Sequence, residues 1–364
     1  MQRSEKSHRK VFFLAFFILF VFVGIFLVRG NYMNVLFSFF FSNGIELKKA
    51  NSHINILLMG RGGGTHDGPD LTDTIIFASV DEKKNRVSMV SIPRDLWVPD
   101  LQAKINTAYA FGKEKDSKGG GITLSRAVMS KIVGEPIDYV VVVDFSGFVK
   151  AVDEVGGLDI TVDRAFDDYE YPLEDKREEL CGHTLEEATE LIATMSATEV
   201  FPCRYTHVHV YSGPQHMNGE RALIFVRSRY GDNGEGSDFA RSKRQQKAIQ
   251  AFREKVLSLG ILLNPIKAIN LYHLLEKSID TNIASSEFDD FIKLAVQMKD
   301  AKIHPVVLQI EDEKGKPGLL VHPEFGEFGG SWVLIPKAGE GNYNEIQSFV
   351  DCVSNSDICP TPTQ

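Results

Sequence analysis

Apolar runs of strand length alternate with helical patterns along the first half of the chain, beginning near residue 51. They contain mainly Val, Ile, Leu and Met and show little alternation with polar residues, as in strands whose sheet is covered on both faces. Four such runs stand at 54–60, 74–80, 86–93 and 139–145. Residues 145–155 instead carry apolar side chains at helical spacing and stop at two glycines, which predicts a helix with a glycine end. The pattern predicts an α/β fold.

The second half of the chain contains a polar, acidic stretch at 163–213, which we interpret as an insertion. Within it, Thr184 and Glu187 have the spacing of a capping box and predict a short helix. Asn218 and Asp238 are suited to cap two further helices. Strand-like residues return after about residue 301, in VVLQI and WVLIP. We therefore expect one domain over 51–364, with a C-terminal extension over 301–364.

The N-terminus carries eighteen uncharged residues from Val11 to Val28. As a helix they reach about 27 Å, enough to cross a bilayer core. Four basic residues precede this run, so the positive-inside rule predicts a cytoplasmic N-terminus and an extracytoplasmic body. We expect 1–28 to be a cytoplasmic tip and membrane anchor, and 29–50 a juxtamembrane stalk. The alternative is a cleaved signal peptide, but no small-residue cleavage motif follows the run.

Composition limits the function classes. Hydrophobic residues make up 43% of the chain, enough for a sizeable core. The 40 Lys and Arg against 49 Asp and Glu give a net charge of −9. An acidic balance argues against nucleic acid as the partner, because such binders usually carry a basic surface.

The four cysteines fall into two local pairs. Cys181 and Cys203 are 22 positions apart, and Cys352 and Cys359 are 7 apart. An even number in an oxidising compartment predicts two disulfides. Four buried free thiols are the alternative.

Charged residues that could form a binding site stand at two places. Arg94 and Asp95 follow the strand at 86–93, at the strand end where open α/β sheets place their binding crevices. Five further cations fall within eighteen residues: Arg227, Arg229, Arg241, Lys243 and Arg244. Arg241 and Gln245 share one helix face, while Lys243 points elsewhere. Arginines gathered in this way suit a multiply charged anion such as a phosphate, and a solvated basic face is the alternative.

Carboxylates also cluster, with Asp67, Asp70 and Asp73 just before the strand at 74–80. Such a group suits a hard divalent cation such as Mg²⁺, and an exposed acidic turn is the alternative. His207 and His209 face the same side of an expected strand and would permit a metal pair, but no third ligand is adjacent. No GxSxG or HExxH motif appears, so a serine hydrolase or zincin has no local support.

These segments, in this order, resemble the LytR-CpsA-Psr family of cell-envelope glycopolymer ligases. The similarity covers about residues 54–259 and rests on these segments: NILLMG, LTDTIIFASVD, VSMVSIPRD, KINTAYAFG, DFSGFVKAVDEVGGLDI, GPQHMNGERALIFVRSRY and GSDFARSKRQQ. The resemblance implies an α-β-α sandwich around a central mixed sheet, with an apolar tunnel for a polyprenyl chain. It also implies transfer of a glycan phosphate from a polyprenyl-diphosphate carrier to a peptidoglycan hydroxyl, with Mg²⁺ or Mn²⁺.

The resemblance also implies roles for single residues. Asp73 would hold the metal and Lys104 would line the site. The diphosphate would be held by Arg94, Arg227, Arg229, Arg241 and Gln245, with Arg244 beside them. The sequence departs from the family at Gly62, where a metal carboxylate is usual, and at Leu71, where an arginine is usual. We expect Asp67 or Asp70 to replace the missing carboxylate.

A lipid diphosphate already contains the energy for a new phosphodiester, which suits a compartment without ATP. In such a transfer, positioned cations stabilise the charge on the transferring and leaving groups. Asp95 or Asp238 would act as general base. Two alternatives stay open: a pyrophosphatase that uses water as the acceptor, and a polyprenyl-lipid-binding protein without catalysis.

Overall fold

The computed structural model describes residues 44–64, 68–258, 260, 278–310, 318–324, 326–356 and 359. The predicted membrane span at 11–28 and the candidate ligand Asp67 lie outside these residues. Within the described part, no helix is both long and apolar enough to cross a bilayer.

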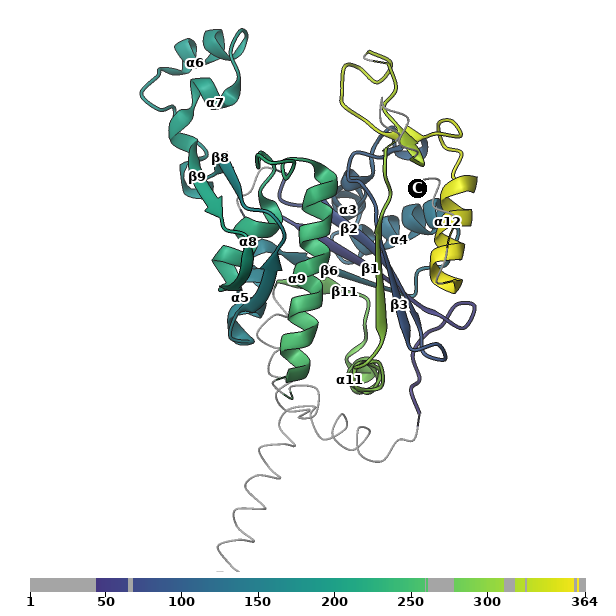
Figure 1. Ribbon diagram of the computed structural model, residues 1–364. Helices are drawn as coiled ribbons and strands as arrows, with labels where there is room; N and C mark the ends of the chain where they lie inside the picture. The colour runs from purple at the N-terminus through teal and green to yellow at the C-terminus, as the bar shows by residue number, and fades with distance from the viewer. Residues whose placement is uncertain are drawn as a thin grey trace, which may run out of the picture.

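A six-stranded mixed sheet forms the centre of the molecule (Figure 1). Its strands, in spatial order, are β11 (Ile279–Thr281), β6 (Tyr139–Asp144), β1 (Ile54–Arg61), β2 (Thr72–Asp81), β3 (Arg86–Ser91) and β12 (Lys302–Val307). β1 pairs in parallel with β6, and β3 with β12, while the other neighbours are antiparallel. The mixed sheet expected from the sequence is confirmed.

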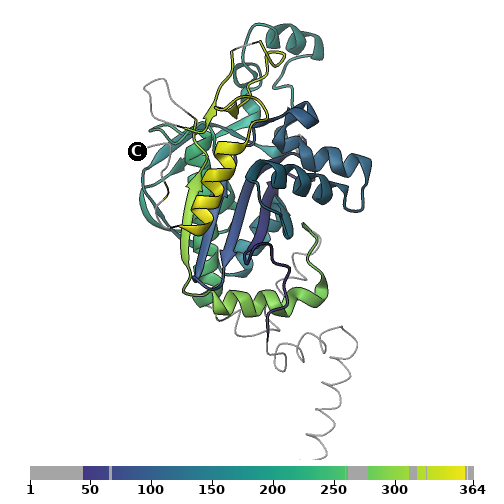
Figure 2. The same cartoon turned by 90° about the vertical axis from the view of Figure 1, so that its right-hand side faces the viewer.

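Helices cover both faces of this sheet (Figures 1 and 2). One face packs against α3 (Ala108–Lys115), α4 (Gly120–Val133) and α12 (Asn344–Asn355). The other faces α9 (Asp238–Ser258), against which α5 (Phe145–Glu154) and α8 (Gly219–Arg227) pack. Along β1, Leu57 and Met59 enter the first core, while Ile56 and Leu58 point to the α9 side. Both faces are apolar, which explains the nearly continuous apolar runs in the sequence.

Shorter elements complete the fold. α11 (Phe288–Gln297) packs at one end of the sheet. Small pairs are formed by β4 (Trp97–Val98) with β5 (Ala103–Lys104), β7 (Leu158–Val162) with β10 (Gly213–Met217), and β13 (Leu320–Val321) with β14 (Ile335–Pro336). The 3₁₀ turns are η1 (Pro99–Leu101), η2 (Ile105–Thr107), η3 (Glu174–Lys176), η4 (Pro202–Arg204) and η5 (Ser285–Glu287).

The acidic stretch forms a hairpin arm that projects from the body (Figure 1). Its strands are β8 (Phe166–Pro172) and β9 (Tyr205–Val210), and its tip contains α6 (Leu185–Ile192) and α7 (Ala197–Val200). The Thr184 capping box is present. The predicted Cys181–Cys203 disulfide is also present and ties the tip together.

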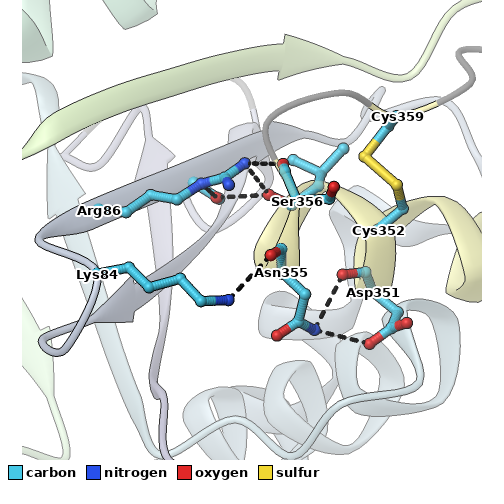
Figure 3. The surroundings of a disulfide bond; sticks show 9 residues. Lys84, Arg86, Asp351, Cys352, Asn355, Ser356 and Cys359 are labelled. Atoms are coloured by element: carbon cyan, nitrogen blue, oxygen red, sulfur yellow. Dashed lines mark hydrogen bonds between the residues drawn. A yellow bond between two sulfur atoms is a disulfide. The ribbon is translucent and has the colours of Figure 1, made fainter.

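The C-terminal helix α12 is fastened to the β2–β3 turn (Figure 3). Lys84 Nζ donates to the Asn355 carbonyl at 2.9 Å, and the Arg86 guanidinium donates to the carbonyls of Val353 and Ser356. The second predicted disulfide, Cys352–Cys359, joins the helix to the chain beyond it. Of WVLIP, only Ile335–Pro336 forms a strand.

Candidate functional site

Two adjoining pockets lie where β2 begins and β3 ends, beside the N-terminus of α9. The polar residues of the first, the narrow pocket, are Asp73, Arg94, Asp238, Arg241, Ser242 and Gln245. The second, the wide pocket, has about 700 Å³ of empty space, part of it open solvent, and is lined by Arg94, Asp95, Lys104, Arg229, Tyr230, Gly236, Asp238 and Trp332. Arg94 and Asp238 belong to both. The structure thus brings together seven residues that the sequence singled out from four separate segments, and an eighth, Arg229, from the loop before α9.

Arg94 reaches the pockets because β3 ends at Ser91 and Pro93 follows. Its Nη1 lies 2.6 Å from Asp73 Oδ1, and its Nε lies 3.5 Å from Asp95 Oδ2. Burial acts to lower the pKa of Arg94, but Asp73 and Asp95 outweigh it and raise that pKa. The buried Nε still makes no hydrogen bond to any described residue. Arg94 is therefore a fixed cation that can still donate from Nε to a ligand.

Arg241 is more deeply buried, with 6% of its side chain exposed. Its Nη1 lies 2.8 Å from Asp238 Oδ1, and its Nε is also without a hydrogen bond among the described residues. Burial lowers the pKa of Arg241, and the nearby charge of Arg94 lowers it further, although Asp238 opposes both. The buried guanidinium of Arg241 and the partly buried one of Arg94 thus repel each other across the narrow pocket, and an anion between them would relieve that repulsion.

Asp238 does not cap α9 as the sequence predicted. The helix begins at Asp238, and the Ser237 hydroxyl accepts the capping hydrogen bond from the Ala240 backbone at 3.1 Å. Because the Ser237 hydroxyl caps the helix, the Asp238 carboxylate is not needed as a cap. It can pair with Arg241 and face both pockets.

Three other predicted arginines have different surroundings. Arg229 is exposed and lines the wide pocket. Arg227 lies outside both linings, where it pairs with Glu174 and stacks over Phe145 at 4.2 Å.

Arg244 is also outside both pockets. It is 4% exposed and donates to the carbonyls of Phe225, Ser228 and Glu235. Its Nη1 also pairs with the Glu235 carboxylate at 2.8 Å. These contacts hold the loop between α8 and α9, so the structure gives Arg244 a structural position and does not place it with the predicted substrate ligands.

Three remaining polar candidates, Asp95, Lys104 and Gln245, line one of the two pockets. Lys104 Nζ donates to Asp95 Oδ1 at 2.7 Å, and Asp95 is buried. Gln245 lines the narrow pocket one turn beyond Arg241, whereas Lys243 is exposed on another face of α9. The helical spacing of Arg241 and Gln245 is confirmed.

The carboxylates do not form a closed metal site. Asp70 lies between Arg61 at 2.6 Å and Lys113 at 2.7 Å, outside both linings. In the part of the chain that the structure describes, no three His, Cys, Asp or Glu residues are placed to hold a metal ion. Asp73 fits an open site, because Mg²⁺ commonly takes one protein carboxylate together with substrate phosphate. Its Oδ1 contacts Arg94, and its Oδ2 has no partner among the described residues.

His207 and His209 lie on the same side of β9, as predicted. Both contact Asp167 Oδ1, at 2.6 and 2.8 Å. Hydrogen bonding to the two histidines lowers the pKa of Asp167. The pair is therefore bound to a carboxylate of the neighbouring strand.

The sequence analysis missed Asp168, a buried carboxylate of β8 with 1% exposure. It accepts hydrogen bonds from the Ser228 hydroxyl and from the backbone N–H of Arg229 at 3.1 Å and of Tyr230 at 3.3 Å. Asp168 thereby positions Arg229 and Tyr230, which line the wide pocket. Its sequence context, an acidic stretch, is typical of exposed residues and concealed this role.

Comparisons with known proteins found a family, a relative and solved structures that are similar to this chain. The model of the LytR_cpsA_psr family matches residues 38–321. The polyisoprenyl-teichoic acid–peptidoglycan teichoic acid transferase TagU of Bacillus mycoides (strain KBAB4) is 28% identical over 258 residues, which is 69% of this chain and 68% of that protein. Among solved structures, B. subtilis TagV matches with a TM-score of 0.55 and 22% identity, covering 85% of this chain and 100% of that one. TagT bound to LIIa-WTA matches with a TM-score of 0.53 and 20% identity, covering 85% and 92%. The structural matches show a shared fold.

Proposed function

Because this chain belongs to the LytR-CpsA-Psr family, we propose that it transfers a phosphorylated glycan from a polyprenyl-diphosphate carrier to a hydroxyl of peptidoglycan or another wall polymer. The product is a phosphodiester. The name of the TagU relative describes a transfer of the same class, from a polyisoprenyl carrier to peptidoglycan.

One observation carries the proposal most strongly. Arg94 and Arg241 lie in one narrow pocket, and each keeps a buried Nε–H without a hydrogen bond among the described residues. An unsatisfied buried donor costs about 1–3 kcal/mol, and more on a charged group. A diphosphate would accept both hydrogen bonds and neutralise both cations, because guanidinium and phosphate match in charge and geometry.

The chemistry follows from the residues that surround this position. The acceptor oxygen attacks the phosphorus that bears the glycan, the bond from that phosphorus to the bridging oxygen breaks, and polyprenyl phosphate leaves. Arg94 and Arg241 stabilise the charge that develops on the phosphoryl and leaving oxygens. The contributions of this chain are therefore chiefly positioning and charge.

Asp238 is our general base for the acceptor proton. It lines both pockets and its side chain is 35% exposed, so an acceptor hydroxyl in the wide pocket can reach it. Asp95 is 7% exposed and already accepts from Lys104 and contacts Arg94. We assign Asp95 the role of fixing those two cations.

Asp73 would hold Mg²⁺ at this site, and the metal would supply additional positive charge to the diphosphate. The residues present fit a one-carboxylate arrangement of this kind.

The lipid tail would extend from the narrow pocket along the α9 side of the sheet. Ile249 follows Gln245 by four positions and so lies one turn further along the same helix face. Around it, aliphatic side chains of the sheet are only partly buried: Ile56, Leu58, Val87 and Ile303. Such a surface suits an apolar chain. A lipid donor also fits our expectation that residues 11–28 anchor the chain with its body outside the membrane.

The direct test incubates the purified full-length protein with a polyprenyl-diphosphate-linked labelled glycan, with and without peptidoglycan. Mass spectrometry should find the glycan joined to peptidoglycan by a phosphodiester, together with polyprenyl monophosphate. Arg94→Ala should remove most of this product, whereas Lys243→Ala, on the exposed face of α9, should not.

Two outcomes would overturn the proposal. Release of glycan phosphate at the same rate with and without peptidoglycan would indicate a pyrophosphatase. Tight binding of the donor without any bond cleavage would indicate a lipid-binding protein.

A further inference from the structure

Two aromatic side chains remain largely exposed at the wide pocket. Tyr230 is 59% and Trp332 is 57% exposed, and both line the pocket together with charged residues. An exposed aromatic ring leaves apolar surface in water, which is unfavourable unless a ligand covers it. Their position among the charged groups suggests a ligand with both apolar and polar surfaces.

Trp332 lies beyond residues 38–321, the part of the chain that the family model matches. Neighbouring residues nevertheless hold it in a fixed place. Two residues further on, the Leu334 N–H donates to the Asp95 carbonyl at 2.9 Å, and the Trp97 N–H donates to the Leu334 carbonyl at 2.8 Å. Val333 and Leu334 are buried. The C-terminal segment is thus attached to the same residue, Asp95, that fixes Lys104 and Arg94, and it brings its indole to the pocket.

The His322 ring packs against Trp332 with a centroid distance of 3.7 Å. This contact covers part of the indole and restricts its rotation, yet more than half of the side chain stays accessible. An indole held in this way is a rigid platform, so little conformational entropy is lost when a ligand stacks on it.

We propose that Trp332 and Tyr230 form a stacking site for a pyranose ring of a substrate glycan, beside the diphosphate position. The proposal rests on the proposed function and names a part of the substrate that this chain recognises. One face of a pyranose presents C–H groups, which pack on an aromatic face, while its hydroxyls project sideways as hydrogen-bond donors and acceptors. Around the two rings, Lys104 and Arg229 can meet such hydroxyls.

The ring can belong to the donor or to the acceptor glycan, and the test separates them. The donor probes are farnesyl diphosphate linked to N-acetylglucosamine and farnesyl diphosphate without sugar. Calorimetric titration of the full chain gives the affinity for each. Trp332→Ala should weaken binding of the sugar-linked probe about three- to tenfold, as expected for the loss of one stacking contact, and should leave the sugar-free probe unchanged. Trp332→Phe should restore most of the affinity.

Tyr211→Ala is the matched control, because Tyr211 is 64% exposed but lies outside both pocket linings. If the ring belongs to the acceptor, Trp332→Ala should leave both donor affinities unchanged and raise the KM for a peptidoglycan disaccharide fragment by the same factor, with kcat unchanged.

Equal weakening of both donor probes would overturn the proposal, because it would show a general effect on the pocket. No change in either donor affinity or in the acceptor KM would overturn it too. If the unmodified protein transfers nothing but its affinity for the sugar-linked probe still depends on Trp332, the transfer proposal fails and the sugar site stands.

Discussion

Three neighbouring cations of α9 should respond differently to the same substitution. Arg241, Lys243 and Arg244 can each be changed to Met, which keeps a long unbranched side chain and removes the charge. Their surroundings differ: Arg241 faces the narrow pocket, Lys243 faces solvent, and Arg244 faces backbone carbonyls.

The magnitudes follow from the contacts. Arg241→Met loses one ion pair with a partly exposed Asp238, worth about 0–1 kcal/mol. It also removes the repulsion with Arg94 and a buried unsatisfied Nε–H, which costs about 1–3 kcal/mol. The free energy of unfolding should therefore stay the same or rise. The transfer rate should fall by about 10²–10³, the usual effect of removing one donor to transition-state charge.

Arg244→Met removes hydrogen bonds to three backbone carbonyls and leaves the Glu235 carboxylate without its cation. Breaking a buried charge network of this kind costs about 3–5 kcal/mol. For a domain of this size, the Tm should fall on the order of 10 °C. Lys243→Met should change stability by less than about 0.5 kcal/mol and leave transfer unchanged.

Thermal unfolding and the transfer assay, run on all three variants, test this reasoning. If the Arg241→Met variant unfolds as readily as the Arg244→Met variant, then Arg241 supports the fold. A folded Arg241→Met that transfers within about twofold of the unmodified protein would mean that the narrow pocket does not hold the reacting phosphate.

Three further outcomes are expected. Asp73→Asn should keep the fold but raise the Mg²⁺ concentration needed for half-maximal transfer at least about tenfold, and an unchanged requirement would remove Asp73 from the metal site. Replacing both Cys181 and Cys203 with Ser should lower the stability of the arm by up to about 3 kcal/mol, seen as faster amide exchange at its tip, while the rest of the domain keeps its protection. Burial alone would raise the pKa of Asp81, but hydrogen bonds from the backbone and from His53 outweigh burial and lower that pKa. The ionised carboxylate therefore stabilises the fold at pH values above its ordinary pKa, and this stabilisation is lost as the pH falls through the lowered pKa. Asp81→Asn should therefore lower the Tm at neutral pH, and the difference should shrink in acid; a constant difference would contradict the assignment.

The sequence predicted the central strands well because their pattern is local. Four nearly continuous apolar runs became β1, β2, β3 and β6, and both cysteine pairs formed disulfides. The edge strand β12 begins at Lys302, earlier than the apolar run VVLQI suggested, because pairing with β3 extends it through polar residues.

For the candidate site, the sequence predicted only those relations that helical spacing determines. The spacing of Arg241 and Gln245 placed both on one face, and both line the narrow pocket. The same spacing cannot separate Arg241 from Arg244, because both are buried and differ only in what distant segments bring to them. Asp168 and Trp332 were missed for a similar reason, since their positions depend on contacts with residues far away in the sequence.

The placement of α12 has a consequence for how the chain must be made. Ile346, Phe349, Val350 and Val353 complete the core on one face of the sheet, against α3 and α4. A ribosome produces these residues after all the strands and helices that they cover. Until then, the apolar surface that they will bury is open to water and to other chains, which is the condition that favours aggregation. The growing chain therefore exposes this surface for most of its synthesis, and loss of α12 should reduce the yield of soluble protein even though no residue of either pocket is removed.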